Sequence, residues 1–387
     1  MSEQKHIEYT EHDRRFMRRA LELAERGKFT TSPNPRVGCV IVKTAPENPE
    51  PIIIGEGFHL KKGAPHAERE ALSSCQDNPS GSTLYVTLEP CCHFGSTPPC
   101  TDAILGAGIK RVVIATQDPY INVSGRGIDI LRRNGLQVDV GLLEEQARYL
   151  NRFFFHRHQT CLPWITLKCA SSLDGKLATT AGESKWITGP ESRAHVHELR
   201  AEADTVLAGI GTILADDPSL TARPEKLSHD QFIPPMRAIL DPLLKIPLQA
   251  RVLQHHDTSK VWIFTSSQAD PEKVQQLQNR GVSVRTVEGD QHSLNLRDVL
   301  STLVDDGVLS VFLEGGPQIH TAFLEQNLVN ELLIYIAPIL IGGADAPTFY
   351  MGHGVATIQD SRRLERIERL TVGEDTLIRG ILNWQLK

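Results

Sequence analysis

The feature that most constrains this chain is a set of three potential metal ligands, His66, Cys91 and Cys100, with Glu68 two residues after the histidine. One imidazole and two thiolates suit Zn²⁺, and a catalytic zinc keeps its fourth position for water. Glu68 is too close to His66 in the sequence for both side chains to hold one ion comfortably, but it can handle the protons of that water. The sequence therefore predicts one zinc held by His66, Cys91 and Cys100, with Glu68 as the catalytic acid and base.

A structural zinc with four protein ligands is the alternative, because Cys92 and His93 directly follow Cys91. Side chains of adjacent residues point in different directions, however, and a structural site has no use for Glu68. We therefore expect a catalytic zinc, and we expect His93 to line the pocket or contact a substrate phosphate.

The order of these residues resembles the signature of zinc deaminases that act on nucleobases, in which His-x-Glu precedes Pro-Cys and the glutamate is the acid and base. The two cysteines of that signature are three residues apart, whereas Cys100 follows Cys91 by nine. A helix is expected over 67–72, so His66 and Glu68 lie where it begins. In the middle of a helix they would point about 200° apart, but at its first turn both can face one cleft.

The composition excludes several classes of protein. A length of 387 residues fits two domains of ordinary size, and a hydrophobic content of 40% is enough to build their cores. The net charge of −6 does not favour nucleic acid binding, which depends on basic residues. No apolar run approaches the roughly 20 residues that span a bilayer. The polar first nine residues do not resemble a signal peptide, and the seven cysteines are expected to be thiols or metal ligands, so we expect a cytoplasmic protein.

Hydrophobic periodicity predicts alternating helices and strands in the first half of the chain. The expected helices are 10–26, 67–72, 102–107, 125–134 and 142–154, and the expected strands are 39–42, 52–54, 84–88, 111–115 and 136–140. This alternation predicts a sheet with helices on both faces and functional residues at the ends of its strands. Residues 153–163 are expected to join the two domains.

A second α/β unit is expected after this junction. Its expected helices are 191–203, 271–280, 296–306 and 320–326, and its expected strands are 164–168, 237–241, 261–265, 282–287, 310–314, 331–341 and 364–385. Because no helix is expected between the last strands, the sheet should end in antiparallel strands.

The motifs together resemble the bifunctional riboflavin-biosynthesis family, in which a pyrimidine deaminase is fused to a pyrimidine reductase. The segments that carry this resemblance are 31–38, 66–68, 88–91, 95–100, 125–127, 172–176 and 216–218. The long spacing between Cys91 and Cys100 is typical of this family. The resemblance implies an α/β fold: a cytidine-deaminase-like three-layer domain at 1–150, followed by a dihydrofolate-reductase-like α/β domain at 151–387. It also implies Zn²⁺ in the first domain and NADPH in the second.

For the deaminase substrate, we expect Asn34 and Asp118 to read the edge of the pyrimidine. Asn34 is favoured because an amide can pair with both donors and acceptors, and capping of its own loop between two prolines is the alternative. The chain departs from the family at Tyr120, where asparagine is usual, while Asn122 follows two places later. That departure places a substrate contact there in question.

For the reductase, residues 314–317 follow the apolar strand 311–313 and precede a helix, so their backbone amides could bind a pyrophosphate. A plain strand-to-helix turn is the alternative for this Gly-Gly-Pro run. The resemblance implies NADPH contacts from Ala170, Trp186, Thr212, Asp216, Gly316, Pro317, Gln318, Ile319, His320, Thr321 and Ala322. It implies substrate contacts from Lys168, Ser184, Arg200, Leu220, Arg223 and Glu314.

Two of these residues also have structural interpretations. Arg200 could lie on a solvated helix face, although its planar guanidinium suits the phosphate of the expected substrate. Trp186 could be a core aromatic, although its polar neighbours at 182–185 favour the wall of a site.

The resemblance predicts a two-step enzyme that deaminates an aminopyrimidine ribosyl phosphate and then reduces its ribosyl group with NADPH. We expect small-molecule substrates, no nucleic acid or membrane partner, and a homo-oligomer. A nucleic-acid-binding or editing protein with a deaminase fold is one competing hypothesis. A chain in which one half has lost its chemistry and serves as a scaffold is another.

Overall fold

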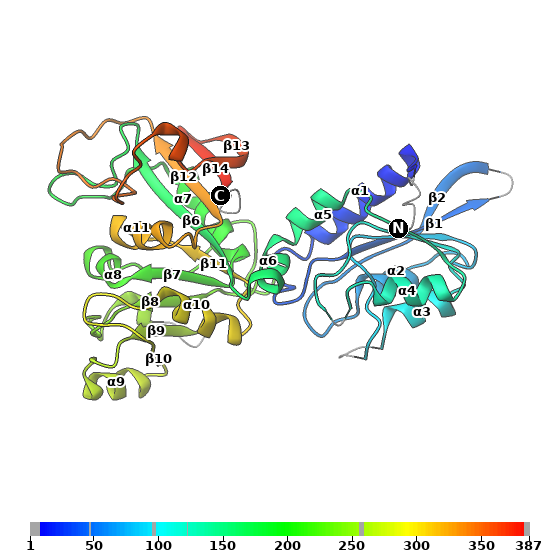
Figure 1. Cartoon of the computed structure of the whole chain (residues 1–387), viewed down its shortest axis with the longest axis horizontal. Coiled ribbons are helices and arrows are strands. Elements are labelled where there is room, and N and C mark those ends of the chain that lie inside the picture. Colours follow the sequence, from blue (N-terminus) through cyan, green and yellow to red (C-terminus); the bar gives the residue numbers. More distant parts are fainter. Residues whose placement is uncertain (1–7, 46–47, 95–97, 122, 255–258, 383–387) are drawn as a thin grey trace. The chain divides into compact units, whose positions relative to one another are not determined.

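The computed structural model describes residues 8–45, 48–94, 98–121, 123–254 and 259–382. The chain separates into two compact units, residues 1–160 and 161–387. Both are α/β units, and each is described by itself (Figure 1).

The first unit contains a five-stranded sheet in the order β2-β1-β3-β4-β5. Its strands are β1 (Gly38–Ala45), β2 (Asn48–Phe58), β3 (Thr83–Val86), β4 (Arg111–Ile114) and β5 (Gln137–Val140). β1 is antiparallel to β2 and β3, whereas β3, β4 and β5 are parallel to one another. The carboxyl ends of β3 and β4 therefore meet at one edge of the sheet.

Helices cover both faces of this sheet, because side chains alternate along each strand. Val40 and Val42 pack on the face that contains Phe16 of α1 (Glu11–Glu25) and Ala147 of α5 (Glu144–Leu150). Cys39 and Ile41 pack on the opposite face, which is covered by α2 (Ala67–Ser73), α3 (Cys100–Gly106) and α4 (Arg126–Arg133). The three-layer prediction is confirmed.

One expected helix is two helices. We predicted a single helix over 142–154 followed by a junction, but the structure has α5 and then α6 (Arg152–Thr160). Asn151 separates them, with φ −103° and ψ 23°. The segment expected to join the two domains, 153–163, contains most of α6, which has a buried side that includes Phe155, and the two compact units divide within this segment, after Thr160.

The second unit contains a nine-stranded sheet in the order β10-β9-β8-β7-β11-β6-β12-β14-β13. Its strands are β6 (Trp164–Ser172), β7 (Thr205–Gly209), β8 (Met236–Leu240), β9 (Val261–Thr265), β10 (Ser283–Thr286), β11 (Ser310–Leu313), β12 (Glu331–Ala337), β13 (Leu364–Val372) and β14 (Asp375–Leu382). In this order, the strands from β10 to β12 are all parallel to one another. β14 is antiparallel to both of its neighbours, β12 and β13. The predicted antiparallel end of the sheet is confirmed.

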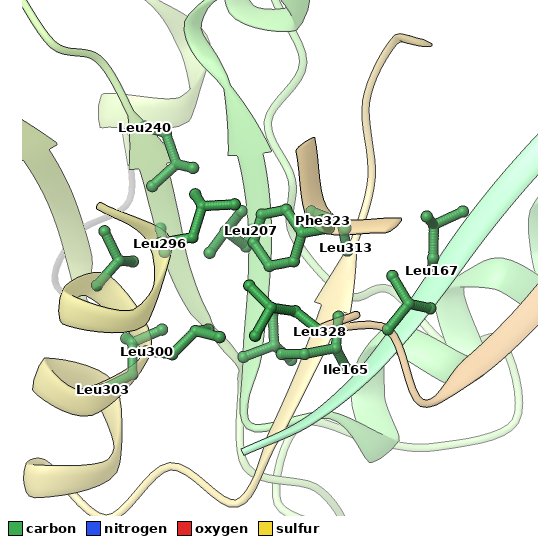
Figure 2. Packing of buried hydrophobic residues seen from close by; sticks show 14 of the residues in the cluster. Ile165, Leu167, Leu207, Leu240, Leu296, Leu300, Leu303, Leu313, Phe323 and Leu328 are labelled. Atoms are coloured by element: carbon green, nitrogen blue, oxygen red, sulfur yellow. The ribbon is translucent and has the colours of Figure 1, made fainter. Parts of the chain in front are cut away.

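The α-helices of this unit are α7 (Pro190–Glu202), α8 (Ile210–Asp216), α9 (Pro271–Gln278), α10 (Leu296–Asp305) and α11 (Pro317–Glu325). Figure 2 shows the core on one face, where Leu300 and Leu303 of α10 and Phe323 of α11 pack against strand residues such as Leu207 and Leu313. A second cluster lies on the other face and includes Val206 and Phe312.

The sequence analysis missed β7 and α8, although β7 lies inside the sheet between β8 and β11. β7 has only five residues, and α8 begins directly after it at Ile210, so neither leaves a long periodic pattern. Among the described residues, no helix combines the length and the apolar character needed to cross a bilayer.

Candidate metal centre and reductase site

The three predicted ligands come from three different segments of the first unit. His66 is the N-cap of α2, Cys91 lies in the turn after β3, and Cys100 is the first residue of α3. Nδ1 of His66 lies 3.4 Å from Sγ of Cys91 and 3.4 Å from Sγ of Cys100. All three ligand atoms lie within 4.8 Å of one another. The structure thus brings together three residues that are up to 34 positions apart.

These separations fit a tetrahedral zinc. With Zn–N near 2.05 Å and Zn–S near 2.3 Å, tetrahedral angles place the nitrogen and a sulfur about 3.6 Å apart. Cys91 is also prepared to act as a thiolate, because hydrogen bonds involving the Cys100 thiol, His66 and the Cys100 backbone outweigh the effect of burial and lower its pKa. The donor set therefore suits zinc without rearrangement of the segments that carry it.

Glu68 lies in the first turn of α2 and is 3% exposed. Burial, together with the nearby charge of Cys91, raises the pKa of Glu68 to about 7. A carboxyl group with such a pKa can both accept and release a proton near neutral pH. Glu68 is not part of the ligand cluster among the described residues, so its position suits proton transfer.

The alternative of a four-ligand structural zinc has no support in the described part of the chain. The only candidate metal cluster there contains His66, Cys91 and Cys100. Cys92 is half-buried and His93 is exposed. The His93 ring lies beside Tyr120, at 6.5 Å between ring centroids.

His59, a residue that the sequence analysis missed, lies between Asn34 and the predicted zinc ligand His66 and contacts both. Nδ1 of His59 bonds the Pro65 carbonyl at 3.0 Å, so this nitrogen carries the proton and Nε2 is an acceptor. Nδ2 of Asn34 lies 3.0 Å from Nε2 of His59 and donates to it. The His59 ring is also edge-on to that of His66, at 5.4 Å. The Asn34 side chain is therefore directed to His59.

Asp118 is held near the centre by Glu89, whose role the sequence analysis did not assign. Glu89 is buried and accepts from the backbone N–H groups of Asp118, Gly125, Gly127 and Ile128 at 3.0–3.2 Å. Burial, with the charges of Glu89 and Cys91, raises the pKa of Asp118 to about 6. In the sequence, the position of Glu89 directly before Pro90-Cys91 was the feature that could have indicated its role at this site.

Tyr120 stands where asparagine is usual in the family, and the structure shows two of its contacts. Its backbone N–H donates to Oδ1 of Asp118 at 2.8 Å, and its ring packs against His158 at 5.4 Å between centroids. Residues 95–97 and Asn122, which the sequence analysis also considered, lie outside the described residues.

The predicted reductase residues gather at one edge of the second sheet. β7, β11 and β6 are neighbouring parallel strands, and their carboxyl ends lead to α8, to Glu314 and α11, and to Ser171–Ser172. Lys168 and Ala170 belong to β6, Thr212 and Asp216 to α8, and Gly316 to Ala322 to the turn and helix after β11. Ligands of open α/β sheets bind in such a crevice.

Arg200 of α7 forms a bidentate ion pair with Glu314. Nε and Nη2 of Arg200 lie 2.5 and 2.8 Å from the two carboxylate oxygens of Glu314, and Nη1 donates to the carbonyl of Thr221. Burial alone would raise the pKa of Glu314, but the charge and hydrogen bonds of Arg200 outweigh it and lower that pKa. The Arg200 side chain is 13% exposed, so it does not lie on a solvated face.

The beginning of α11 is suited to a phosphate. Gly316 is its N-cap and no side chain caps the helix there. A Cβ on Gly316 would meet no atom within 4 Å, so its backbone faces open space. Gly315 is different: it has φ 153°, and a Cβ there would lie 2.7 Å from Ile319. The open helix terminus fits the pyrophosphate of a dinucleotide.

Several predicted contact residues differ in how they can reach a ligand. Trp186 is 69% exposed, with the Arg193 guanidinium over its ring at 4.6 Å, so it is not a core residue. Oγ of Ser184 lies 3.4 Å from Oδ1 of Asp216. Leu220 is 2% exposed and His320 is 1% exposed. In this structure neither residue presents more than a small part of its side chain or backbone to a ligand.

Comparisons with known proteins match both halves of the chain. A family model described as the cytidine and deoxycytidylate deaminase zinc-binding region matches residues 10–116, and the RibD C-terminal domain matches residues 163–378. The riboflavin biosynthesis protein RibD of Bacillus amyloliquefaciens is 42% identical over 366 residues, which cover 95% of each chain. The chain belongs to the RibD family.

Further relatives support this assignment. RibD of Escherichia coli K12 is 40% identical over 95% of this chain and 98% of its own length. The solved structure of Acinetobacter baumannii RibD superposes with a TM-score of 0.86 at 36% identity, covering 96% of this chain and 99% of that chain. A Thermotoga maritima structure gives a TM-score of 0.79 at 34% identity with the same coverage.

This RibD-family chain is therefore a bifunctional deaminase and reductase of riboflavin biosynthesis. It combines a zinc-binding, cytidine-deaminase-like domain with an NADPH-dependent RibD reductase domain. The predictions of fold class, enzymatic activity and cofactors are confirmed.

Proposed function

We propose that the chain first deaminates 2,5-diamino-6-ribosylamino-4(3H)-pyrimidinone 5′-phosphate and then reduces the ribosyl group of 5-amino-6-(5-phosphoribosylamino)uracil to ribityl with NADPH. The Thermotoga maritima relative bears the names of these two activities. The observation that carries the proposal is the convergence of His66, Cys91 and Cys100 beside buried Glu68. The two activities are assigned to the predicted domains 1–150 and 151–387.

In the deaminase domain, a zinc ion bound by His66, Cys91 and Cys100 supplies a Lewis acid that makes water a nucleophile at neutral pH. Glu68 would carry one proton of that water to the ring nitrogen and then the second proton to the amino group, which leaves as ammonia while the water oxygen stays on the ring carbon. Asn34, fixed by His59, reads the pyrimidine edge with Asp118. His93, which is exposed, is available to the substrate phosphate.

In the reductase domain, NADPH supplies the hydride that reduces C1′ of the opened ribosyl group. The open N-terminus of α11 would hold the pyrophosphate of the cofactor, and Thr212, Asp216 and Trp186 would contribute further contacts. Lys168, Arg200, Arg223 and Glu314 bind the phosphorylated substrate, together with Ser184 and Leu220. The Arg200–Glu314 pair keeps both side chains in fixed orientations for this task.

The test is to supply the aminopyrimidine phosphate with and without NADPH and to record ammonia and the absorbance at 340 nm separately. We expect ammonia release without NADPH, and a fall in absorbance when both are present. Purified deaminated product should restore the absorbance change in a variant that no longer deaminates. Ammonia release that is absent in the zinc-loaded chain would contradict the first half of the proposal, and a constant absorbance with deaminated product would contradict the second.

We further propose that the chain acts in the cytoplasm on small molecules, without a nucleic acid or membrane partner, and as a homo-oligomer. β13 supports the last point, because it ends the nine-stranded sheet and is exposed along most of its length. Antiparallel pairing of two β13 strands about Ile367 would place Glu365 opposite Arg369 and Arg366 opposite Glu368. Light scattering should give a multiple of the 42.9 kDa chain mass, and Ile367→Lys should lower it.

A further inference from the structure

Asn151, between α5 and α6, pairs with the backbone of a distant loop. Its Oδ1 accepts from the N–H of Arg36 at 2.8 Å, and its Nδ2 donates to the carbonyl of Arg36 at 2.8 Å. Asn151 is 4% exposed, and the two residues are 115 positions apart. One side chain therefore satisfies both backbone polar groups of Arg36.

This pairing substitutes for regular structure. Residues 35–37 belong to no helix or strand, and the side chain of Asn151 pairs with both backbone polar groups of Arg36. Buried backbone groups are costly when unpaired. The side-chain amide of Asn151 offers a carbonyl acceptor and an N–H donor next to each other, and it uses both on the same residue. Asn151 thereby holds the loop that directly precedes β1.

The loop that Asn151 fixes carries Asn34. Pro35 is the only residue between Asn34 and Arg36, and its ring restricts φ to about −65°. Few backbone torsions therefore separate the anchored Arg36 from Asn34. On the other side, the N–H of Asn34 bonds the carbonyl of Thr31 at 2.9 Å. Loss of the Asn151 anchor would release one end of this short segment.

The beginning of α6 also holds the Arg36 side chain. The Arg36 guanidinium lies 5.9 Å from the centre of the Phe153 ring, and Arg152 lies 4.3 Å from the same ring. Arg36 is 7% exposed. The α5–α6 junction thus contacts both the backbone and the side chain of Arg36.

We propose that Asn151 is a positioning residue for deamination: by holding the backbone of Arg36, it presents Asn34 to the pyrimidine. The proposal rests on the proposed function, in which Asn34 reads the pyrimidine edge. Asn151 lies outside the ligand cluster, and His66, Cys91 and Cys100 come from other segments. Its loss should therefore affect the use of substrate while leaving the metal in place.

The test is a double-mutant cycle of Asn151→Ala and Asn34→Ala in the full-length zinc-loaded chain, with the aminopyrimidine phosphate as substrate. Asn151→Ala should lower kcat/KM for ammonia release about tenfold or more, chiefly through KM, since small misplacements of reacting groups can cost up to about 10²-fold. In the Asn34→Ala background the same change should cost less than about twofold, because residues that act through one another are not additive.

The controls separate positioning from general destabilisation. Asn134→Ala removes an exposed amide that donates to the carbonyl of Ile130 at 2.9 Å, and should leave kcat/KM unchanged. Zinc per chain reports whether the first unit is folded, and NADPH oxidation reports on the second. Should Asn151→Ala lose zinc, Asn151→Asp replaces it in the cycle, since it keeps the acceptor for the N–H of Arg36.

Three results would overturn the inference: wild-type kcat/KM in the Asn151 variant, wild-type kcat/KM in Asn34→Ala, or losses that multiply in the double variant. A parent chain that releases no ammonia would instead contradict the proposed function. The two failures are thereby distinguishable.

Discussion

Replacement of Glu68 by glutamine should abolish deamination while leaving zinc bound. The glutamine side chain has nearly the shape of glutamate but cannot carry the two protons of water, one to the ring nitrogen and one to the amino group that leaves as ammonia. Glu68 is 3% exposed, so bulk water has little access to replace it. The ligand cluster of the described residues does not include Glu68, so the metal should remain.

The expected loss follows from the number of proton transfers. A positioned acid or base contributes about 10²–10⁴-fold. Burial raises the pKa of Glu68 to about 7, so its carboxyl group can both accept and release a proton. Glu68 performs at least two proton transfers in this reaction. We therefore expect a loss of about 10⁴-fold in kcat, which corresponds to about 5.4 kcal/mol at 1.36 kcal/mol per tenfold.

The assay measures ammonia release at saturating substrate together with zinc per chain. NADPH oxidation with deaminated product is the internal control, because the second unit contains none of these residues. Ammonia release within about tenfold of the parent, with zinc present, would refute the assignment of Glu68 as the proton carrier.

Three further predictions concern other parts of the chain. Arg200→Ala should lower the free energy of unfolding of the second unit by about 3–5 kcal/mol in urea, because it leaves the largely buried carboxylate of Glu314 without its partner. A decrease below about 1 kcal/mol would contradict this prediction. Asp13 has a pKa lowered to about 2: burial opposes this shift, but bonds from Arg111 and others outweigh it. The Asp13 carboxylate should therefore contribute about 2 kcal/mol to the free energy of unfolding above pH 4, and this contribution should be lost between pH 4 and 2. Asp13→Asn should remove this pH dependence of stability, and a variant with the same pH dependence as the parent would contradict the assignment. Cys92→Ala should retain one zinc per chain, and loss of zinc would identify Cys92 as a ligand.

The sequence alone predicted the residues whose chemistry is distinctive. His66, Cys91 and Cys100 are recognisable because few residue types bind zinc and their order follows a known signature. The strands of both sheets were predicted where apolar runs are long, as in β6. β7 and α8 were missed because each is short and one follows the other without a turn.

Residues that act through contacts distant in sequence could not be predicted. His59 and Asn151 are ordinary polar residues in the sequence, and only the fold brings them to Asn34 and Arg36. The same applies to Arg200, whose helix carries many charges and whose partner Glu314 is 114 residues away. Glu89 was visible as part of a motif, but its four backbone donors come from a loop that the sequence does not place.

X-ray absorption at the zinc edge of the purified chain tests the central claim most directly, since it counts the donors around the metal. The arrangement of His66, Cys91 and Cys100 predicts one nitrogen at about 2.0–2.1 Å, two sulfurs at about 2.3 Å and one oxygen from solvent. A sphere with three sulfurs, or with two nitrogens and two sulfurs, would mean that Cys92 or His93 closes the site, and would contradict a catalytic zinc.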